Sequence, residues 1–183
     1  MQVTLEQLAS LRNAGTPCGI FSVCSAHPVV LRAALRHGRE TGSTVLIEAT
    51  CNQVNHQGGY TGMTPADFAA LVFDIASDEG CPPELIVLGG DHLGPNPWRF
   101  LPAESAMAEA AAMVSAYVAA GFRKIHLDAS MGCANEPDAL DDVTTANRAA
   151  KLARVAEEVS KRMNGAMPLY IIGTEVPPPG GAD

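Results

Sequence analysis

Short apolar segments alternate along the chain with longer segments in which apolar residues recur at helical spacing. The short segments are rich in Val, Ile and Leu, the composition of strands that are buried on both faces of a parallel sheet. Five such segments are predicted, at residues 19–24, 45–49, 85–90, 124–128 and 169–175. Between them the apolar residues follow the three-to-four-residue spacing of a helix with one buried face.

The predicted helices carry start and stop signals. In one of them Thr64 suits the cap, Pro65 suits the first turn, and Asp67 lies three residues after the cap, as in a capping box. Gly80 and the Cys-Pro-Pro that follows it stop the same helix, and Gly121 follows another predicted helix, where a residue free to take positive φ is favoured. Helices are predicted at residues 4–13, 28–38, 64–80 and 103–120, and from residue 141 to about residue 163.

This alternation predicts an α/β fold with a parallel sheet and right-handed crossovers. Two closures are compatible with it: a flavodoxin-like five-stranded sheet, or the first part of a TIM (β/α)8 barrel, with four strand–helix units and a fifth strand. The barrel is favoured because every predicted strand ends in polar residues, which a barrel gathers at one mouth. In addition, a Pro- and Gly-rich segment, residues 176–183, follows the fifth strand where a helix is expected. Since barrels need about 250 residues, residues 1–183 are predicted to be one domain, an incomplete barrel.

The polar residues at the strand ends are the candidates for facing a ligand. Asp91 and His92 stand out among them, because they follow an apolar segment and Gly89–Gly90. Since Gly94 and Pro95 stop regular structure, we expect the pair in an irregular loop. The alternative is a structural role, with acids that cap helices or brace loops. The candidate ligand-facing residues are His27, Glu48, Asn52, Asp91, His92, Asp128, Ser130 and Glu175.

Composition narrows the classes of partner. The formal net charge is −8, from 20 acidic and 12 basic residues, and no basic run or basic–aromatic patch occurs. This excludes nucleic acid and anionic membrane surfaces as expected partners. Five widely spaced cysteines without a Cys-x-x-Cys pair predict buried, reduced thiols and a cytoplasmic protein. Neither a signal peptide nor a segment of membrane-spanning length is found.

Six motifs in a fixed order resemble one known family along essentially the whole chain. They are SVCSAHP at 22–28, VLIEATCNQVN at 45–55, GGYTGMTPADF at 58–68, LGGDHLGPN at 88–96, KIHLDASM at 124–131 and IGTEVP at 172–177. Together they resemble the Z-type subunit family of class II D-tagatose-1,6-bisphosphate aldolase, the GatZ/KbaZ family. Members of that family are usually more than twice as long, so the resemblance covers their N-terminal portion.

The resemblance implies a TIM-barrel-like accessory subunit without catalytic activity of its own. Such a subunit supports the stability and full activity of a catalytic, zinc-dependent Y-type subunit, in a chaperone-like way. The pathway implied is tagatose 6-phosphate degradation, in galactitol or N-acetylgalactosamine catabolism. The expected partners are therefore the Y-type subunit and a sugar phosphate. The zinc is expected in the partner, and no cofactor is expected in this chain.

Two enzymatic alternatives follow from the same resemblance. In catalytic class II aldolases an Asp-His pair like Asp91–His92 supplies an acid–base group and one metal ligand, so the chain could itself be a zinc-dependent sugar-bisphosphate aldolase. However, the other metal ligands of those enzymes come from later strands. The remaining histidines here lack ligand spacing, and His126, inside a predicted strand, is interpreted as structural. We therefore assign no catalytic residue and no metal ligand.

The second alternative is a tagatose-6-phosphate kinase, the label that some relatives carry. A phosphate-binding loop of the Gly-x-x-x-x-Gly-Lys-Ser/Thr type does not occur in the chain, and the glycine-rich segment 58–62 is not followed by a lysine. The kinase reading is therefore the weakest of the three.

Overall fold

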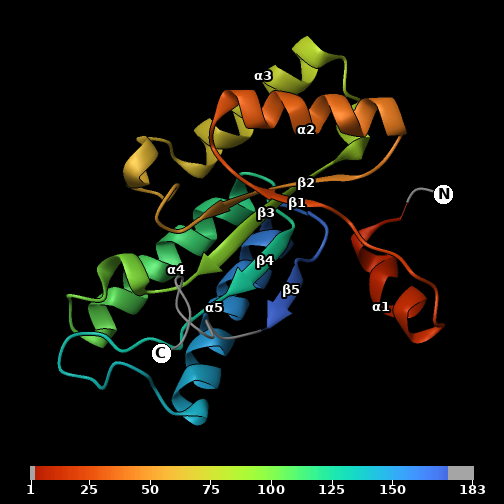
Figure 1. Ribbon diagram of the computed structural model, residues 1–183. Helices are drawn as coiled ribbons and strands as arrows, with labels where there is room; N and C mark the ends of the chain where they lie inside the picture. Colours follow the sequence, from red (N-terminus) through yellow and green to blue (C-terminus); the bar gives the residue numbers. More distant parts are fainter. Residues whose placement is uncertain (1–2, 173–183) are drawn as a thin grey trace, which may run out of the picture.

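The computed structural model describes residues 3–172 as a curved, five-stranded parallel sheet with a helix in each connection between strands (Figure 1). The strands are β1 (Ser22–Cys24), β2 (Val45–Thr50), β3 (Ile86–Leu93), β4 (Lys124–Leu127) and β5 (Leu169–Ile172). The helices are α1 (Leu5–Asn13), α2 (Pro28–Thr41), α3 (Pro65–Glu79), α4 (Ala103–Ala119) and α5 (Asp142–Arg162), with short 3₁₀ turns at Gly59–Thr61, Pro83–Leu85 and Asn96–Trp98.

The strand order decides between the two predicted closures. The strands follow one another in the order β1-β2-β3-β4-β5, and all pairs are parallel. A flavodoxin-like sheet reverses direction after its first strands, which places helices on both faces. Here every right-handed crossover moves the same way, so α2 to α5 cover one face and each contacts the next. The fold is thus α/β with the topology of the first part of a TIM barrel, and the barrel is not closed within residues 3–172.

The main core lies between the sheet and the layer formed by α2 to α5. Phe68 from α3, Tyr117 from α4, and Ile47 and Ile125 from the strands are fully buried there. The Tyr117 hydroxyl donates a hydrogen bond of 2.9 Å to the carbonyl of Val54, so the phenol oxygen is satisfied inside this layer. These contacts leave the opposite face of the sheet uncovered by the four helices.

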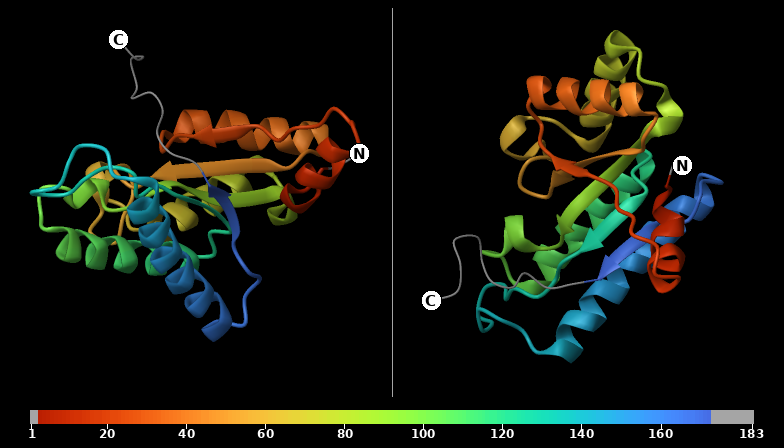
Figure 2. Two further views of the ribbon diagram at one scale, coloured as in Figure 1. Left: turned by 90° about the horizontal axis from the view of Figure 1, so that it is seen from below. Right: turned by 45° about the vertical axis from the view of Figure 1, so that its right-hand side comes forward.

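Helix α1 lies beside the amino-terminal ends of the strands (Figure 2). Arg123, just before β4, forms an ion pair of 3.1 Å with Glu6 of α1. The hydroxyl of Thr44, just before β2, donates a hydrogen bond of 2.9 Å to the carbonyl of Val3. The carboxyl-terminal ends of the strands therefore lie on the side away from α1.

One boundary differs from the prediction in a way that affects the site. Asp91 and His92 lie within β3, not in a loop, because the strand continues to Leu93. Asp91 is in register with Thr50 of β2, and Leu93 with Leu127 of β4, so sheet pairing extends past the glycines. The register with β4 shifts between Gly90 and Leu93, and His92 takes a positive φ of 51°. The pair therefore occupies an irregular part of a strand.

The remaining differences are smaller. Helix α2 continues three residues beyond Gly38, and Gly42, with φ of 63°, ends it. Cys51, Cys81 and Cys133 are buried as predicted, but Cys18 and Cys24 are exposed, since they lie on or before the edge strand β1. Glu175 falls outside residues 3–172. Across that range, no helix is long and apolar enough to cross a membrane.

Candidate functional site

Charged and imidazole side chains from β2, β3 and β4 converge beside the carboxyl-terminal half of β3. They are Glu48, Asp91, His92, Lys124 and His126, called here the Asp91 cluster. The register explains the convergence, because Gly89 of β3 is paired with both Glu48 of β2 and Lys124 of β4. Since paired residues point to the same face of a sheet, and residues two apart do so as well, the cluster lies on the face opposite α2 to α5.

Asp91 is the centre of the cluster. Its Oδ1 atom lies 2.9 Å from Nδ1 of His126 and 3.2 Å from Nζ of Lys124. Its Oδ2 atom lies 3.0 Å from Nδ1 of His92. The rings of His92 and His126 have their centroids 4.3 Å apart. One carboxylate thus contacts three nitrogen-bearing side chains from two adjacent strands.

Lys124 connects this carboxylate to a second one. Its ammonium forms an ion pair with Oε1 of Glu48, whose other oxygen accepts a hydrogen bond from the hydroxyl of Ser22. Glu48 and Lys124 are both buried. Gly89 makes room for the pair, because a Cβ at that position would lie 2.7 Å from Oε1 of Glu48. A glycine that the sequence marked only as the end of an apolar run therefore leaves space for the Glu48 carboxylate in the cluster.

The two carboxylates differ in acidity. Burial alone would raise the pKa of Asp91, but the hydrogen bond from His126 and the positive charges of Lys124 and His92 outweigh it and lower that pKa. Burial raises the pKa of Glu48, although Lys124 acts in the opposite direction. A pair of acids whose environments separate their pKa values is a common arrangement for acid–base chemistry. In this cluster Asp91 stays ionised and Glu48 is the acid that more readily holds a proton.

The cluster also contains a set of metal-ligand atoms. One ligand atom each from Asp91, His92 and His126 lies within 4.8 Å of the others. The sequence-based interpretation of His126 as structural missed this, because the histidine is 35 residues away from Asp91 in the chain. Lys124 was missed as well. The sequence did contain a signal for both residues. They lie two positions apart in an apolar strand, and alternate residues of a strand point to the same face of the sheet.

The other predicted residues lie elsewhere or have local partners. Asp128 is buried and accepts hydrogen bonds from the backbone N–H and the hydroxyl of Ser130, at 3.1 and 2.7 Å. His27 caps α2, where its Nδ1 accepts a hydrogen bond from the N–H of Val29. Asn52 is exposed, in the loop after β2. Asp128 and Ser130 thus have the loop-bracing contacts of the structural alternative, and whether any of these residues faces a ligand stays a prediction.

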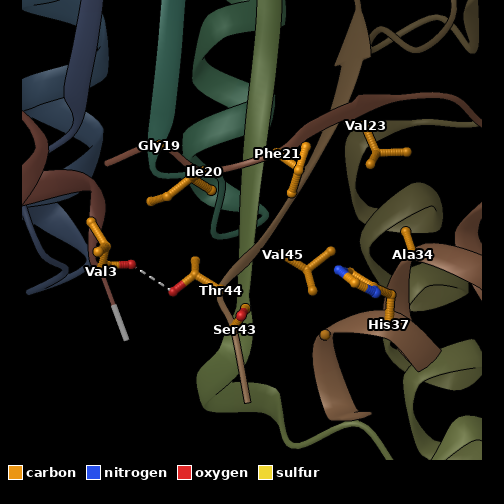
Figure 3. Close-up of a pocket in the computed structure, with 11 residues that line it drawn as sticks. Val3, Gly19, Ile20, Phe21, Val23, Ala34, His37, Ser43, Thr44 and Val45 are labelled. Atoms are coloured by element: carbon orange, nitrogen blue, oxygen red, sulfur yellow. Dashed lines mark hydrogen bonds between the residues drawn. The ribbon is translucent and has the colours of Figure 1, made fainter. Parts of the chain in front are cut away.

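A small hollow lies at the other end of the sheet (Figure 3). It has a volume of about 160 Å³ and lies between Val3, Phe21, His37 and Val45. Small-molecule sites usually enclose 300–1,000 Å³. The hollow is therefore too small and too far from the Asp91 cluster to be its substrate pocket.

A parallel sheet with its strands in sequential order, helices on one face and charged groups on the other, has the layout of a barrel-type α/β protein. The chain belongs to the family described as D-tagatose-1,6-bisphosphate aldolase subunit GatZ/KbaZ-like, whose model matches residues 5–183.

Relatives in this family carry different names. The chain is 68% identical over 183 residues to a D-tagatose 6-phosphate 4-epimerase of Agrobacterium fabrum, covering 100% of this chain and 43% of the relative. It is 54% identical over 177 residues to the D-tagatose-1,6-bisphosphate aldolase subunit GatZ of Salmonella heidelberg, covering 97% of this chain and 42% of the relative.

A solved structure supports the fold. A crystal structure of a probable tagatose 6 phosphate kinase from Sinorhizobium meliloti 1021 matches with a TM-score of 0.81 and 60% identity, over 87% of this chain and 40% of that chain. The chain thus spans about two fifths of the length of these relatives.

Proposed function

We propose that the full-length protein acts in the metabolism of D-tagatose phosphates, as a subunit of a D-tagatose-1,6-bisphosphate aldolase. The observation that carries this proposal is the family match over residues 5–183, together with 54% identity to a GatZ subunit. The partner is a catalytic subunit of the Y type, which holds the zinc, and the site of action is the cytoplasm. In this role the full-length protein increases the stability and activity of its partner.

A second candidate function is 4-epimerisation of D-tagatose 6-phosphate to D-fructose 6-phosphate. Two observations favour it: the 68% identity to an epimerase over the whole chain, and the presence of an acid–base cluster in which Glu48 and Lys124 are buried. A subunit that only stabilises its partner would not need Glu48 and Asp91 around a buried lysine. The cluster therefore gives the epimerase candidate a chemical basis.

The two reactions share one chemical step. An aldolase acting on a ketohexose bisphosphate breaks the bond between C3 and C4. The C4 hydroxyl loses a proton, and the bonding electrons move into an enediolate at C2 and C3. An epimerase can invert C4 by breaking the same bond, letting the aldehyde turn, and forming the bond again on its other face. The proton then returns to the C4 oxygen, and no oxidant is consumed.

The Asp91 cluster holds groups that suit this step. Glu48, whose pKa burial raises, is suited to accept and return the C4 hydroxyl proton. The ammonium of Lys124 supplies a fixed positive charge beside it, which stabilises negative charge on an enediolate oxygen. Asp91 orients Lys124 and His126. In the aldolase candidate the Y-type partner carries out this step, so the cluster gives a chemical role to this chain only in the epimerase candidate.

The test uses the full-length protein in two assays. In the first, the protein alone is incubated with D-tagatose 6-phosphate, and D-fructose 6-phosphate is followed by ¹³C NMR. In the second, cleavage of D-tagatose 1,6-bisphosphate by a Y-type subunit is measured with and without the protein. Stimulation of cleavage without conversion supports the aldolase subunit, and conversion by the protein alone supports the epimerase. If the protein has no effect in either assay, the proposal is overturned.

The kinase named for the structural neighbour is checked in the same samples. Because the chain lacks a Gly-x-x-x-x-Gly-Lys loop, we expect no ATP-dependent phosphorylation of D-tagatose 6-phosphate. Formation of a bisphosphate product from ATP would contradict that expectation.

A further inference from the structure

Three ligand-type side chains of the Asp91 cluster lie at the spacing of ligands around one ion. Nδ1 of His126 and Nδ1 of His92 lie 2.9 and 3.0 Å from the two oxygens of Asp91. Metal–nitrogen and metal–oxygen bonds are about 2.0–2.2 Å long, so two ligand atoms of one ion are about 3–4 Å apart. These contacts are hydrogen bonds, which coordination bonds to an ion would replace, and one ligand atom of each of the three residues lies within 4.8 Å of the others.

The backbone places consecutive residues on the same side of the sheet. In a regular strand the side chains of Asp91 and His92 would point to opposite faces. The register shift after Gly90 and the positive φ of His92 remove this alternation, and both side chains reach the face that carries His126. A positive φ at a non-glycine residue is strained, and such strain is concentrated at functional sites.

Two further side chains of the cluster lie outside the three ligands. Lys124 contacts the carboxylate of Asp91, and Glu48 contacts Lys124. They hold the Asp91 carboxylate in place, as the outer partners of metal ligands do.

We propose that Asp91, His92 and His126 bind one divalent transition-metal ion. A set of two imidazoles and one carboxylate suits zinc, cobalt, manganese or iron(II) better than magnesium or calcium, which prefer oxygen ligands. Three protein ligands leave positions open for substrate oxygens. If the proposed function holds, a metal here supplies a Lewis acid for the C2 carbonyl beside the cleaved bond. The binding itself rests only on the ligand geometry.

The test is metal binding by the full-length protein after removal of metals with a chelator. Isothermal titration with Zn²⁺, Mn²⁺ and Mg²⁺ gives affinity and stoichiometry, and Co²⁺ reports nitrogen ligands through its visible absorption. We expect Zn²⁺ or Co²⁺ to bind at this site with one ion per chain, and Mg²⁺ to bind weakly. His92→Gln and His126→Gln should each weaken binding by at least about 100-fold, since even outer-partner mutations cost 10–100-fold.

The matched control is His37→Ala, which removes an exposed histidine on α2 and should leave binding unchanged. Circular dichroism and thermal melting of each variant separate loss of a ligand from loss of the fold. Absence of Zn²⁺, Mn²⁺ and Co²⁺ binding in the wild-type protein would overturn the inference. Equal affinity in the wild-type protein and in both folded glutamine variants would also overturn it, because the ions would then bind elsewhere.

The outcomes for the metal and for the proposed function are distinct. Metal binding that depends on His92 and His126, without either sugar-phosphate activity, supports the site and rejects the function. Full activity of the metal-free protein leaves the function in place and rejects the Lewis-acid role of the metal, whereas the metal site is rejected only by the binding measurements.

Discussion

Two charge networks in this protein have similar parts and different surroundings. Between α2 and α3, Glu79 accepts hydrogen bonds from Arg32 at 3.0 Å and Arg36 at 2.9 Å, and its backbone carbonyl accepts one from Arg39. In the Asp91 cluster the carboxylate of Asp91 likewise meets several nitrogen donors. The arginine side chains are 41–55% exposed, whereas the side chain of Lys124 is 8% exposed.

The difference in burial indicates a difference in role. Glu79 is itself buried, but the guanidinium groups around it keep much of their hydration, so only one partner of each ion pair in this network is desolvated. Glu48 and Lys124, in contrast, have both lost nearly all of their hydration. Replacing a buried ion pair with apolar residues often gives a protein of equal or greater stability, so such a pair is not explained by stability alone. The helix network therefore has a sufficient explanation in the fold, and the Asp91 cluster is better explained by chemistry.

Asp91→Asn tests this contrast most strongly. It keeps the size of the side chain but removes the charge that holds Lys124 and His126. We expect the sugar-phosphate activity of the full-length protein to fall by about 10²-fold or more, the range of acid–base and positioning groups. Glu79→Gln, the matched change in the other network, should leave that activity unchanged. Equal activity of the two variants would remove the functional distinction between the networks.

Lys124→Met tests the cost of burying the charges. Glu48 and Asp91 would then be close together without a cation, and breaking a buried pair in this way costs about 3–5 kcal/mol. Urea denaturation of the full-length protein measures the loss. Adding Glu48→Gln to the same chain should restore part of the stability, because one of the two unpaired charges is removed. A loss that is the same in the single and double variants would show that Lys124 contributes by packing alone.

The smallest expected effect concerns pH. Hydrogen bonds from Arg36 and Arg32 lower the pKa of Glu79 from 4.5 to about 2. The folded protein therefore keeps Glu79 ionised in a range where the unfolded chain binds a proton, so stability falls as the pH decreases from about 4.5 towards 2. Glu79→Gln should reduce this slope in denaturation curves. It should not abolish the slope, since the pKa of Asp91 is lowered as well.

Hydrophobic periodicity predicted the elements well and their connections only in part. All five strands and all five helices of residues 3–172 occur where the pattern placed them, with ends shifted by a few residues. Capping signals were reliable, as Thr64 and Asp67 form the predicted reciprocal cap. The extension of β3 through Asp91 and His92 was missed, because pairing with Thr50 and Leu127 outweighs the glycines that marked a loop.

By itself, the sequence determined the order of strands and helices, the family, and Asp91 and His92 as candidate residues, because these depend on local pattern and motif. Only the tertiary structure decided which residues join that pair. Lys124 and His126 lie 33 and 35 residues from Asp91, and Glu48 comes from a third strand. Register between parallel strands places them together, and it depends on the packing of the whole sheet against its helices. No local spacing in the chain encodes that register.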